Sequence, residues 1–316
     1  PKGLTAPVET DTDWTGARFL IDDVNCEDHT ASVFHVRSPK KPLPLQAASM
    51  VYGQATLENP FGYDLFVAVE NRNHRDYIRK GLNQDNGHTR TDVFVLGADG
   101  RLSSPLSFDF EEITSLLACP IDEETLTLKG GSFTTIANQA ESKYNYHYRN
   151  IHITRSNVEV SGITHLITGE GDHGAPYNGF IRLSDCARVC IRDCLFTGHF
   201  IYHTIGSAGL PVPMGSYDIR LDRTAEIRIL RCSQTTDIHD SRYWGLIATN
   251  FCRDLCFEDC TFSRFDAHMG VTNCTLRRCR LGWQCLNAIG NGTFLIEETE
   301  AHGNAFVNLR DDYGCT

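Results

Sequence analysis

The segment Val189-Cys-Ile-Arg-Asp-Cys-Leu-Phe196 recurs in outline as Leu255-Cys-Phe-Glu-Asp-Cys-Thr-Phe262. In each copy, apolar residues occupy alternate positions and lead into a cysteine. Alternation with a period of two is the pattern of a short β-strand that buries one face. Two copies of one strand pattern indicate an internal repeat, and a repeat constrains the architecture of the whole chain.

The repeat extends to six units when the sequence is aligned on the position of that cysteine, which we call the slot. From the N- to the C-terminal unit, the slot holds Ile163, Cys194, Cys232, Cys260, Cys279 and Thr299. Five residues earlier stand Val158, Val189, Ile227, Leu255, Cys274 and Phe294. Three residues earlier stand Val160, Ile191, Ile229, Phe257, Leu276 and Ile296.

The spacing of the slots selects the fold. Successive slots are 31, 38, 28, 19 and 20 residues apart. A period near 20 is too short for a strand and a helical crossover, which together need about 30 residues. It fits a coil of short strands joined by turns, so we predict an all-β, right-handed parallel β-helix whose longer spacings are loops. A leucine-rich repeat, the main competitor, needs fixed leucines and an asparagine that these units lack.

We predict two parts along the chain. Residues 124–316 hold the regular coils. Residues 1–123 are less regular but β-rich, with strand-like runs at 17–23, 32–36, 64–69 and 91–96. They are expected to form an N-terminal cap or subdomain with the first irregular coils. The chain begins at Pro1 and stops just after a strand-like run, so we expect further sequence beyond Thr316.

Composition excludes some classes of partner. The chain of 316 residues has 29 basic and 40 acidic residues, a net charge of −11. Binding of nucleic acid or an anionic membrane surface needs a dense basic face, so neither partner is expected. No apolar run reaches the 18 residues of a membrane span. Most of the thirteen cysteines are interpreted as buried apolar residues of the repeat, and no metal site is expected.

The Val/Ile-x-Ile-x-Asp-Cys-x-Phe strands, as in 189–196 and 255–262, resemble those of the pectin-lyase-like superfamily of right-handed β-helices. The opening segment Asp13-Trp-Thr-Gly-Ala-Arg-Phe-Leu-Ile-Asp-Asp23 is also similar to early strands of such proteins. The resemblance implies a carbohydrate-active protein. Polysaccharide lyases, glycoside hydrolases, epimerases and phage tailspikes share this fold, so the fold does not choose the reaction.

Polar residues shortly after the slots are the first candidates for chemistry. Asp237 follows its slot by five residues and Asp266 by six, which suggests carboxylates on adjacent coils. Around Asp266, alternation places Arg264 and His268 on the same side of a strand. A cation, an acid and a base on one face suit acid–base chemistry on a sugar. We therefore predict Asp237, Asp266, Asp311, His268 and Arg264 as catalytic residues; a surface salt bridge is the alternative at Arg264–His268.

Further polar and aromatic residues are predicted to bind substrate. One group lies one coil earlier, between Thr236 and Gly245, where a plain turn capped by aspartates is an equally fair interpretation. A second group lies beside Asp311, where a charged turn is the alternative. The third lies in loops, with Asp172 and His173 as further rim candidates. The predicted binding residues are Arg310, Asp312, His199, His203, His239, Asp240, Tyr243, Trp244 and Glu170.

The preferred function is a glycoside hydrolase that works by paired carboxylates on a polysaccharide or oligosaccharide. The first alternative is a polysaccharide lyase that acts by β-elimination on a uronate polymer, with Arg264 or His268 as the base and with Arg310 or calcium neutralising the carboxylate. The second is a non-catalytic carbohydrate-binding solenoid of the tailspike kind. No cofactor is expected beyond that possible calcium. The substrate class suggests an extracellular or periplasmic location, and the oligomeric state stays open.

Overall fold

The computed structural model describes residues 3–77, 87–206 and 209–315, and within them every regular element is a strand. The N-terminal third contains β1 (Ala6–Val8), β2 (Thr12–Asp13), β3 (Arg18–Asp22), β4 (Phe34–Val36), β5 (Leu65–Tyr77), β6 (Gly87–Leu96), β7 (Ser115–Pro120), β8 (Leu126–Lys129) and β9 (Ser132–Ile136). The middle contains β10 (Ile151–Ile153), β11 (Val158–Ser161), β12 (Thr164–Thr168), β13 (Asn178–Arg192), β14 (Leu195–Phe196), β15 (His199–Phe200), β16 (Tyr202–Ile205), β17 (Pro211–Met214), β18 (Tyr217–Leu230) and β19 (Ser233–Gln234). The last coils contain β20 (Tyr243–Trp244), β21 (Leu246–Glu258), β22 (Thr261–Arg277), β23 (Arg280–Glu297), β24 (Glu300–Ala301) and β25 (Val307–Arg310).

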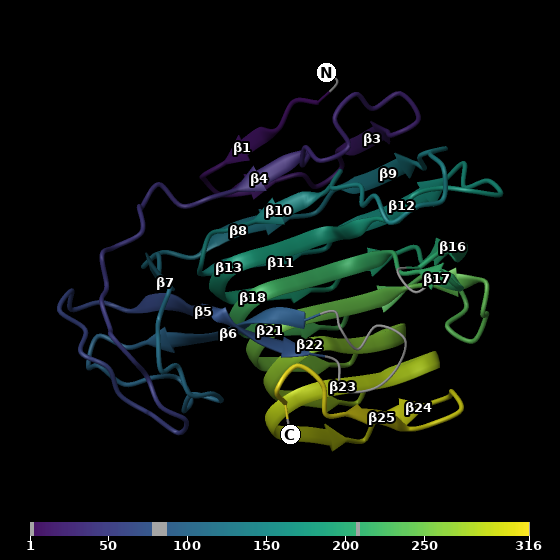
Figure 1. The fold of residues 1–316 in the computed structure, drawn as a ribbon. Helices are drawn as coiled ribbons and strands as arrows, with labels where there is room; N and C mark the ends of the chain where they lie inside the picture. The colour runs from purple at the N-terminus through teal and green to yellow at the C-terminus, as the bar shows by residue number, and fades with distance from the viewer. Residues whose placement is uncertain (1–2, 78–86, 207–208, 316) are drawn as a thin grey trace.

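The protein is a right-handed parallel β-helix, as the repeat predicted. Eighteen strands form one continuous parallel sheet that winds through the coils, stacked in Figure 1 from the purple N-terminal strands to the yellow C-terminal ones. The register follows the alignment of the repeat. The residues five before the slot pair coil to coil, in the order Val158, Val189, Ile227, Leu255, Cys274 and Phe294.

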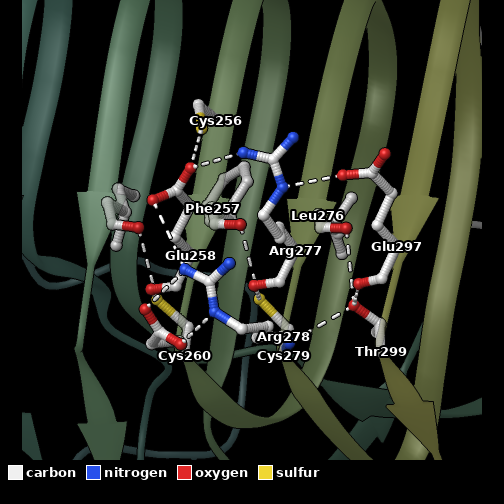
Figure 2. Close-up of polar contacts among 12 residues, drawn as sticks. Cys256, Phe257, Glu258, Cys260, Leu276, Arg277, Arg278, Cys279, Glu297 and Thr299 are labelled. Carbon is white, nitrogen blue, oxygen red and sulfur yellow. Dashed lines mark hydrogen bonds and ion pairs between the residues drawn. The ribbon is translucent and has the colours of Figure 1, made fainter.

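The slot residues form a column inside the coil. Cys194, Cys232, Cys260 and Cys279 are all buried, each with its thiol near a backbone carbonyl. Outside, the neighbouring positions carry charges of alternating sign. Figure 2 shows Arg277 between Glu258 and Glu297, with nitrogen–oxygen distances of 3.2 and 2.7 Å. Opposite charges placed side by side across strands stabilise this register.

Tight turns connect the strands of each coil. The residue before the slot has a positive φ in several coils, as in Asp193, Arg231, Asp259, Arg278 and Glu298. A single residue in the left-handed conformation turns the chain sharply without a longer loop. For a residue other than glycine, this conformation costs roughly 1–2 kcal/mol. Because the same position is left-handed in successive coils, the turns stack and the strands keep one register.

The segment that carries β5, β6 and β7 leaves the solenoid as an insertion. Strands β6, β5 and β7 form a separate antiparallel sheet, at the left of Figure 1. By contrast, β1 to β4 already pair with β8 to β10, so residues 6–36 belong to the parallel coils. One face of the insertion packs on the turns of the solenoid through Phe66, Val93 and Ala225.

Loops of unequal length leave the coil at one corner. They span 137–150, 169–177, 197–216 and 235–245, after β9, β12, β14 and β19 respectively. The loop 197–216 carries the hairpin β16–β17, at the right of Figure 1, and β15 pairs with β20 of the loop 235–245. The next two coils lack such loops, because β22 and β23 run through the corner as continuous strands.

Candidate functional site

Parallel strands of successive coils, including those that follow these loops, share an outward row of mostly polar residues. In register from coil to coil, the row contains His35, His152, Arg182, Arg220, position 248, Asp266, Asn287 and Asn308. The residues beside them in each strand, such as Ile181 and Leu183, point inward and are fully buried. The alternation of the strand therefore puts the whole row on one outer face. We call it the polar row.

Asp266 is the centre of the C-terminal half of the row. Its Oδ1 lies 3.1 Å from Arg264 Nη2 and accepts a hydrogen bond of 2.7 Å from Asn287 Nδ2, and its Oδ2 lies 3.5 Å from His268 Nδ1. Burial raises the pKa of Asp266, but the hydrogen bond from His268 and the charge of Arg264 outweigh it, so the pKa falls below its ordinary 3.8. The carboxylate is therefore ionised at neutral pH.

Exposure separates the roles of these three side chains. Only 4% of the Asp266 side chain is exposed, against 20% of Arg264 and 42% of His268. Asp266 contacts its neighbours rather than the solvent, whereas His268 presents its ring to the outside. With Nδ1 facing Asp266, no protein atom in the described ranges hydrogen-bonds to the Nε2 of His268. Nδ1 is thus the ring nitrogen next to Asp266, and a hydrogen bond there would leave Nε2 as the nitrogen that can accept a proton from a ligand.

Aromatic residues border this centre. The Arg264 guanidinium lies 5.7 Å from the centroid of Trp244, which packs in one cluster with Tyr217 and Tyr146. On the insertion, burial lowers the pKa of His88 of β6, and the nearby charges of Arg75 and His268 lower it further. The Asp266 centre thus lies near Trp244 of the loop 235–245, and its His268 interacts with His88 of β6.

A second charged group occupies the N-terminal half of the row. Asp222 Oδ2 accepts hydrogen bonds from Arg220 Nε at 2.9 Å and Arg182 Nε at 3.3 Å, and its Oδ1 accepts one of 2.6 Å from Asn250. Burial raises the pKa of Asp222, but the two arginines outweigh that effect and lower it. Arg182 stacks over Tyr148, and Arg220 lies beside Tyr146 and Tyr217.

Asp237 is not the neighbour of Asp266 that the sequence pattern predicted. Leu246, which pairs with Arg264, comes 13 positions after Ser233, whereas Arg264 comes only three positions after Thr261. The extra residues form the loop 235–245, so Asp237 lies exposed in a turn and accepts a hydrogen bond from the backbone N–H of His239. The strand position beside Asp266 is 248 instead.

Several predicted binding residues lie in the loops. Asp240 pairs with Arg242 in an exposed turn, while Tyr243 stacks on Phe200 at 5.0 Å. His239 lies edge-on to His302, and Trp244 is buried. His203 is exposed on β16, and Asp172 and His173 are exposed in the loop 169–177.

Glu170 and His199 form a buried pair beneath the loops. His199 Nδ1 lies 3.2 Å from Glu170 Oε1, and the His199 ring stacks on Tyr177 at 4.8 Å. Glu170 also accepts a hydrogen bond from the backbone N–H of Phe200. The pair joins the loops 169–177 and 197–216, so in this structure it positions the loops.

The third predicted cluster lies at the end of the described chain. Arg310, the last residue of β25, forms an ion pair with Asp312, and Asp312 is buried while Asp311 is exposed. Leu309, which stands between Asn308 of the polar row and Arg310 in the sequence, is exposed. Their predicted roles in catalysis and binding stay predictions.

Sequence reasoning missed Arg182, Arg220 and Asp222. A signal was present: Ile181-Arg-Leu and Ile219-Arg-Leu are 38 residues apart, the same spacing as the slots Cys194 and Cys232. Extending the repeat alignment to these segments would have placed both arginines in one row. The aromatic contacts from residues 146 and 148 had no such signal, because they come from a loop.

Within residues 3–77, 87–206 and 209–315, no group of three or more His, Cys, Asp or Glu side chains is arranged to hold a metal ion. No helix in the same ranges is long and apolar enough to cross a membrane.

Comparison with known proteins assigns the fold class. No family model and no curated protein matches the sequence. Among solved structures, the tailspike protein of Pseudomonas phage LKA1 matches with a TM-score of 0.50 and 12% identity over 94% of this chain. This chain spans 52% of the length of that tailspike. At this identity the likeness concerns the fold: both are parallel β-helices.

Two more distant matches are also tailspikes. That of Pseudomonas phage phi297 has a TM-score of 0.29 and 9% identity, over 96% of this chain and 66% of the other. That of Acinetobacter baumannii bacteriophage AP22, whose structure contains a capsular saccharide, has a TM-score of 0.26 and 10% identity, over 98% of this chain and 70% of the other.

Proposed function

We propose that the chain binds an acidic polysaccharide along the polar row and cleaves it by β-elimination, with His268 as the base. The observation that carries the proposal is the pairing of the buried Asp266, whose pKa is lowered, with the exposed His268, the Nδ1 of which lies 3.5 Å from the carboxylate. A histidine oriented by a carboxylate is suited to take a proton from a ligand.

The row has the dimensions for an extended polymer. Neighbouring strands lie about 4.8 Å apart, so successive coils present one polar position at intervals comparable to a sugar ring. Asn308, which donates a hydrogen bond of 2.9 Å to the buried Asn287, is exposed and offers an amide for sugar hydroxyls. Tyr146 is partly exposed at the border of the row and offers a ring face.

The elimination balances with the residues at this centre. His268 Nε2 takes the proton at C5 of a uronate sugar, and the electron pair forms a C4–C5 double bond while the C4–O bond breaks. The departing oxygen takes up a proton, which the protonated His268 or water supplies. Arg264 offsets the charge that develops on the uronate carboxylate, and Asp266 holds both residues in place.

A hydrolase is the second candidate, because Asp222 and Asp266 lie on the same face. Hydrolysis by paired carboxylates needs one of the two protonated. Burial raises the pKa values of both carboxyl groups, but their partners lower them overall. The main partner is Arg220 for Asp222, and for Asp266 the partners are His268 and Arg264. By strand spacing their backbones are also about 12 Å apart. The pair therefore supports hydrolysis less well than the Asp266–His268 pair supports elimination.

The test is a screen of uronate and neutral polysaccharides with two parallel readouts. A lyase produces an unsaturated sugar that absorbs in the ultraviolet, together with new reducing ends. We expect both signals from uronate polymers, and we expect H268Q to lower kcat by about 10²- to 10⁴-fold, the usual contribution of a general base. H302Q, at an exposed histidine paired with Glu300, is the matched control and should retain activity.

Three outcomes would contradict β-elimination at His268. Reducing ends without absorbance would indicate the hydrolase, and D222N and D266N would then be compared. Full activity of H268Q would show that His268 is not the base. Binding without any turnover would indicate a non-catalytic carbohydrate-binding solenoid.

A further inference from the structure

The Arg182–Arg220 pair, with Asp222 between its two arginines, is the most strongly charged part of the face outside the Asp266 centre. The two arginines are register partners on β13 and β18, so their backbones are about 4.8 Å apart. Each uses its Nε to bond the same oxygen of Asp222. Two guanidinium groups around one carboxylate leave one positive charge without a counter-ion in the pair.

The terminal nitrogens of both arginines are open. In the described part of the chain, no protein group accepts a hydrogen bond from the Nη atoms of Arg182 or Arg220. Their side chains are 21% and 18% exposed, so the rest of each side chain is held while part of it reaches solvent. Guanidinium N–H groups that have no protein acceptor can bind the two oxygens of a carboxylate.

The neighbouring side chains hold Arg182, Arg220 and Asp222 in place and do not cancel the remaining positive charge. Tyr148 lies against Arg182, Tyr146 and Tyr217 lie against Arg220, and Asn250 holds the other oxygen of Asp222. The next acid on β18, Asp218, is fully buried. Burial and Glu170 raise its pKa well above the ordinary value, which disfavours its charged form.

We infer that the terminal nitrogens of Arg182 and Arg220 form a second anion-binding subsite, which takes the carboxylate of a sugar about two units from the bond that is cleaved. Arg220 and Asp266 are two strands apart in the polar row, which corresponds to about 10 Å. The inference rests on the proposed function and narrows its substrate. The polymer must carry at least two carboxylates within a few sugars, as a polyuronate does.

The test measures binding apart from cleavage, by calorimetric titration of the H268Q protein. The probes are oligosaccharides of polygalacturonate, alginate and hyaluronan, each beside its carboxyl-reduced form. Adding R182Q or R220Q should raise the Kd for the acidic oligosaccharide that binds by about tenfold or more and should weaken its salt dependence. The Kd for the carboxyl-reduced form should not change.

Controls separate this subsite from general charge and from misfolding. R228Q removes an exposed arginine from the same strand β18 and should leave the Kd unchanged. R182K keeps the charge but loses the planar fork, so it should bind between the parent and R182Q. Circular dichroism checks the fold of each variant, and R182Q decides the question if R220Q does not fold.

Two results would overturn the inference, and they differ in what they mean for the proposed function. If the acidic oligosaccharide binds H268Q but R182Q and R220Q bind it equally tightly, the subsite is absent and polysaccharide binding stands. If neither acidic nor reduced oligosaccharides bind, and the unsubstituted protein cleaves no member of the panel, both proposals fail.

Discussion

At the scale of single residues, His152 gives the stability a dependence on pH. Burial, Arg182 and the stacked His35 lower the pKa of His152 to about 4. A folded-state pKa below the ordinary 6.5 means that only the unfolded chain binds this proton between those values, so stability falls as the pH drops from 6.5 toward 4. In H152Q the loss of unfolding free energy between pH 7 and pH 5, measured by denaturant titration, should be smaller. An equal loss in both proteins would contradict this role.

Residues also show where prediction from sequence stopped. The inward positions were predictable because burial repeats every second residue and every coil, which places Val189 and Leu255 in one row. The partners of Asp266 on its own strand, Arg264 and His268, followed from the same alternation. The predicted place of Asp237 beside Asp266 was wrong because a loop shifts it out of the strand, and loop length leaves no periodic signal.

At the scale of the element, the left-handed turn before the slot is the feature to test. Asp259 has φ of 55° and its Oδ1 lies 2.8 Å from Arg278 Nε. Both D259A and D259G lose this exposed ion pair, but only glycine removes the strain of the left-handed backbone. We expect D259G to be more stable than D259A by about 1 kcal/mol in denaturant-induced unfolding.

The neighbouring Glu258 supplies the matched control for that turn. It ends the extended strand β21, where glycine has no conformational advantage and costs about 0.5–1 kcal/mol relative to alanine. The order of stability should therefore reverse, with E258A above E258G. The same order at both positions would mean that backbone conformation does not limit the turn.

At the scale of the whole molecule, Arg253 holds the insertion on the solenoid. Its side chain is fully buried, and its Nη2 hydrogen-bonds both oxygens of Asp92 at 2.7 Å, while its Nε bonds the carbonyl of Val93. The two partners are 161 positions apart in the sequence, and nothing in the repeat connects them. This explains why the β-rich character of the N-terminal part could be predicted from its alternating strands, but not its place on the turns of the coil.

For the buried pair, the loss of stability should depend on whether one partner or both partners are removed. R253M leaves Asp92 as a buried charge without its partner and should lower the unfolding free energy by about 3–5 kcal/mol. R253M/D92N removes both charges and should recover part of that loss. The exposed pair of Arg188 with Asp64, at the same interface, is the control, and R188M should cost at most about 1 kcal/mol. Denaturant titration measures all three, and limited proteolysis reports whether the insertion detaches first. If R253M and R188M cost the same, the insertion is held by its apolar contacts around Phe66 and Val93 rather than by the buried charge.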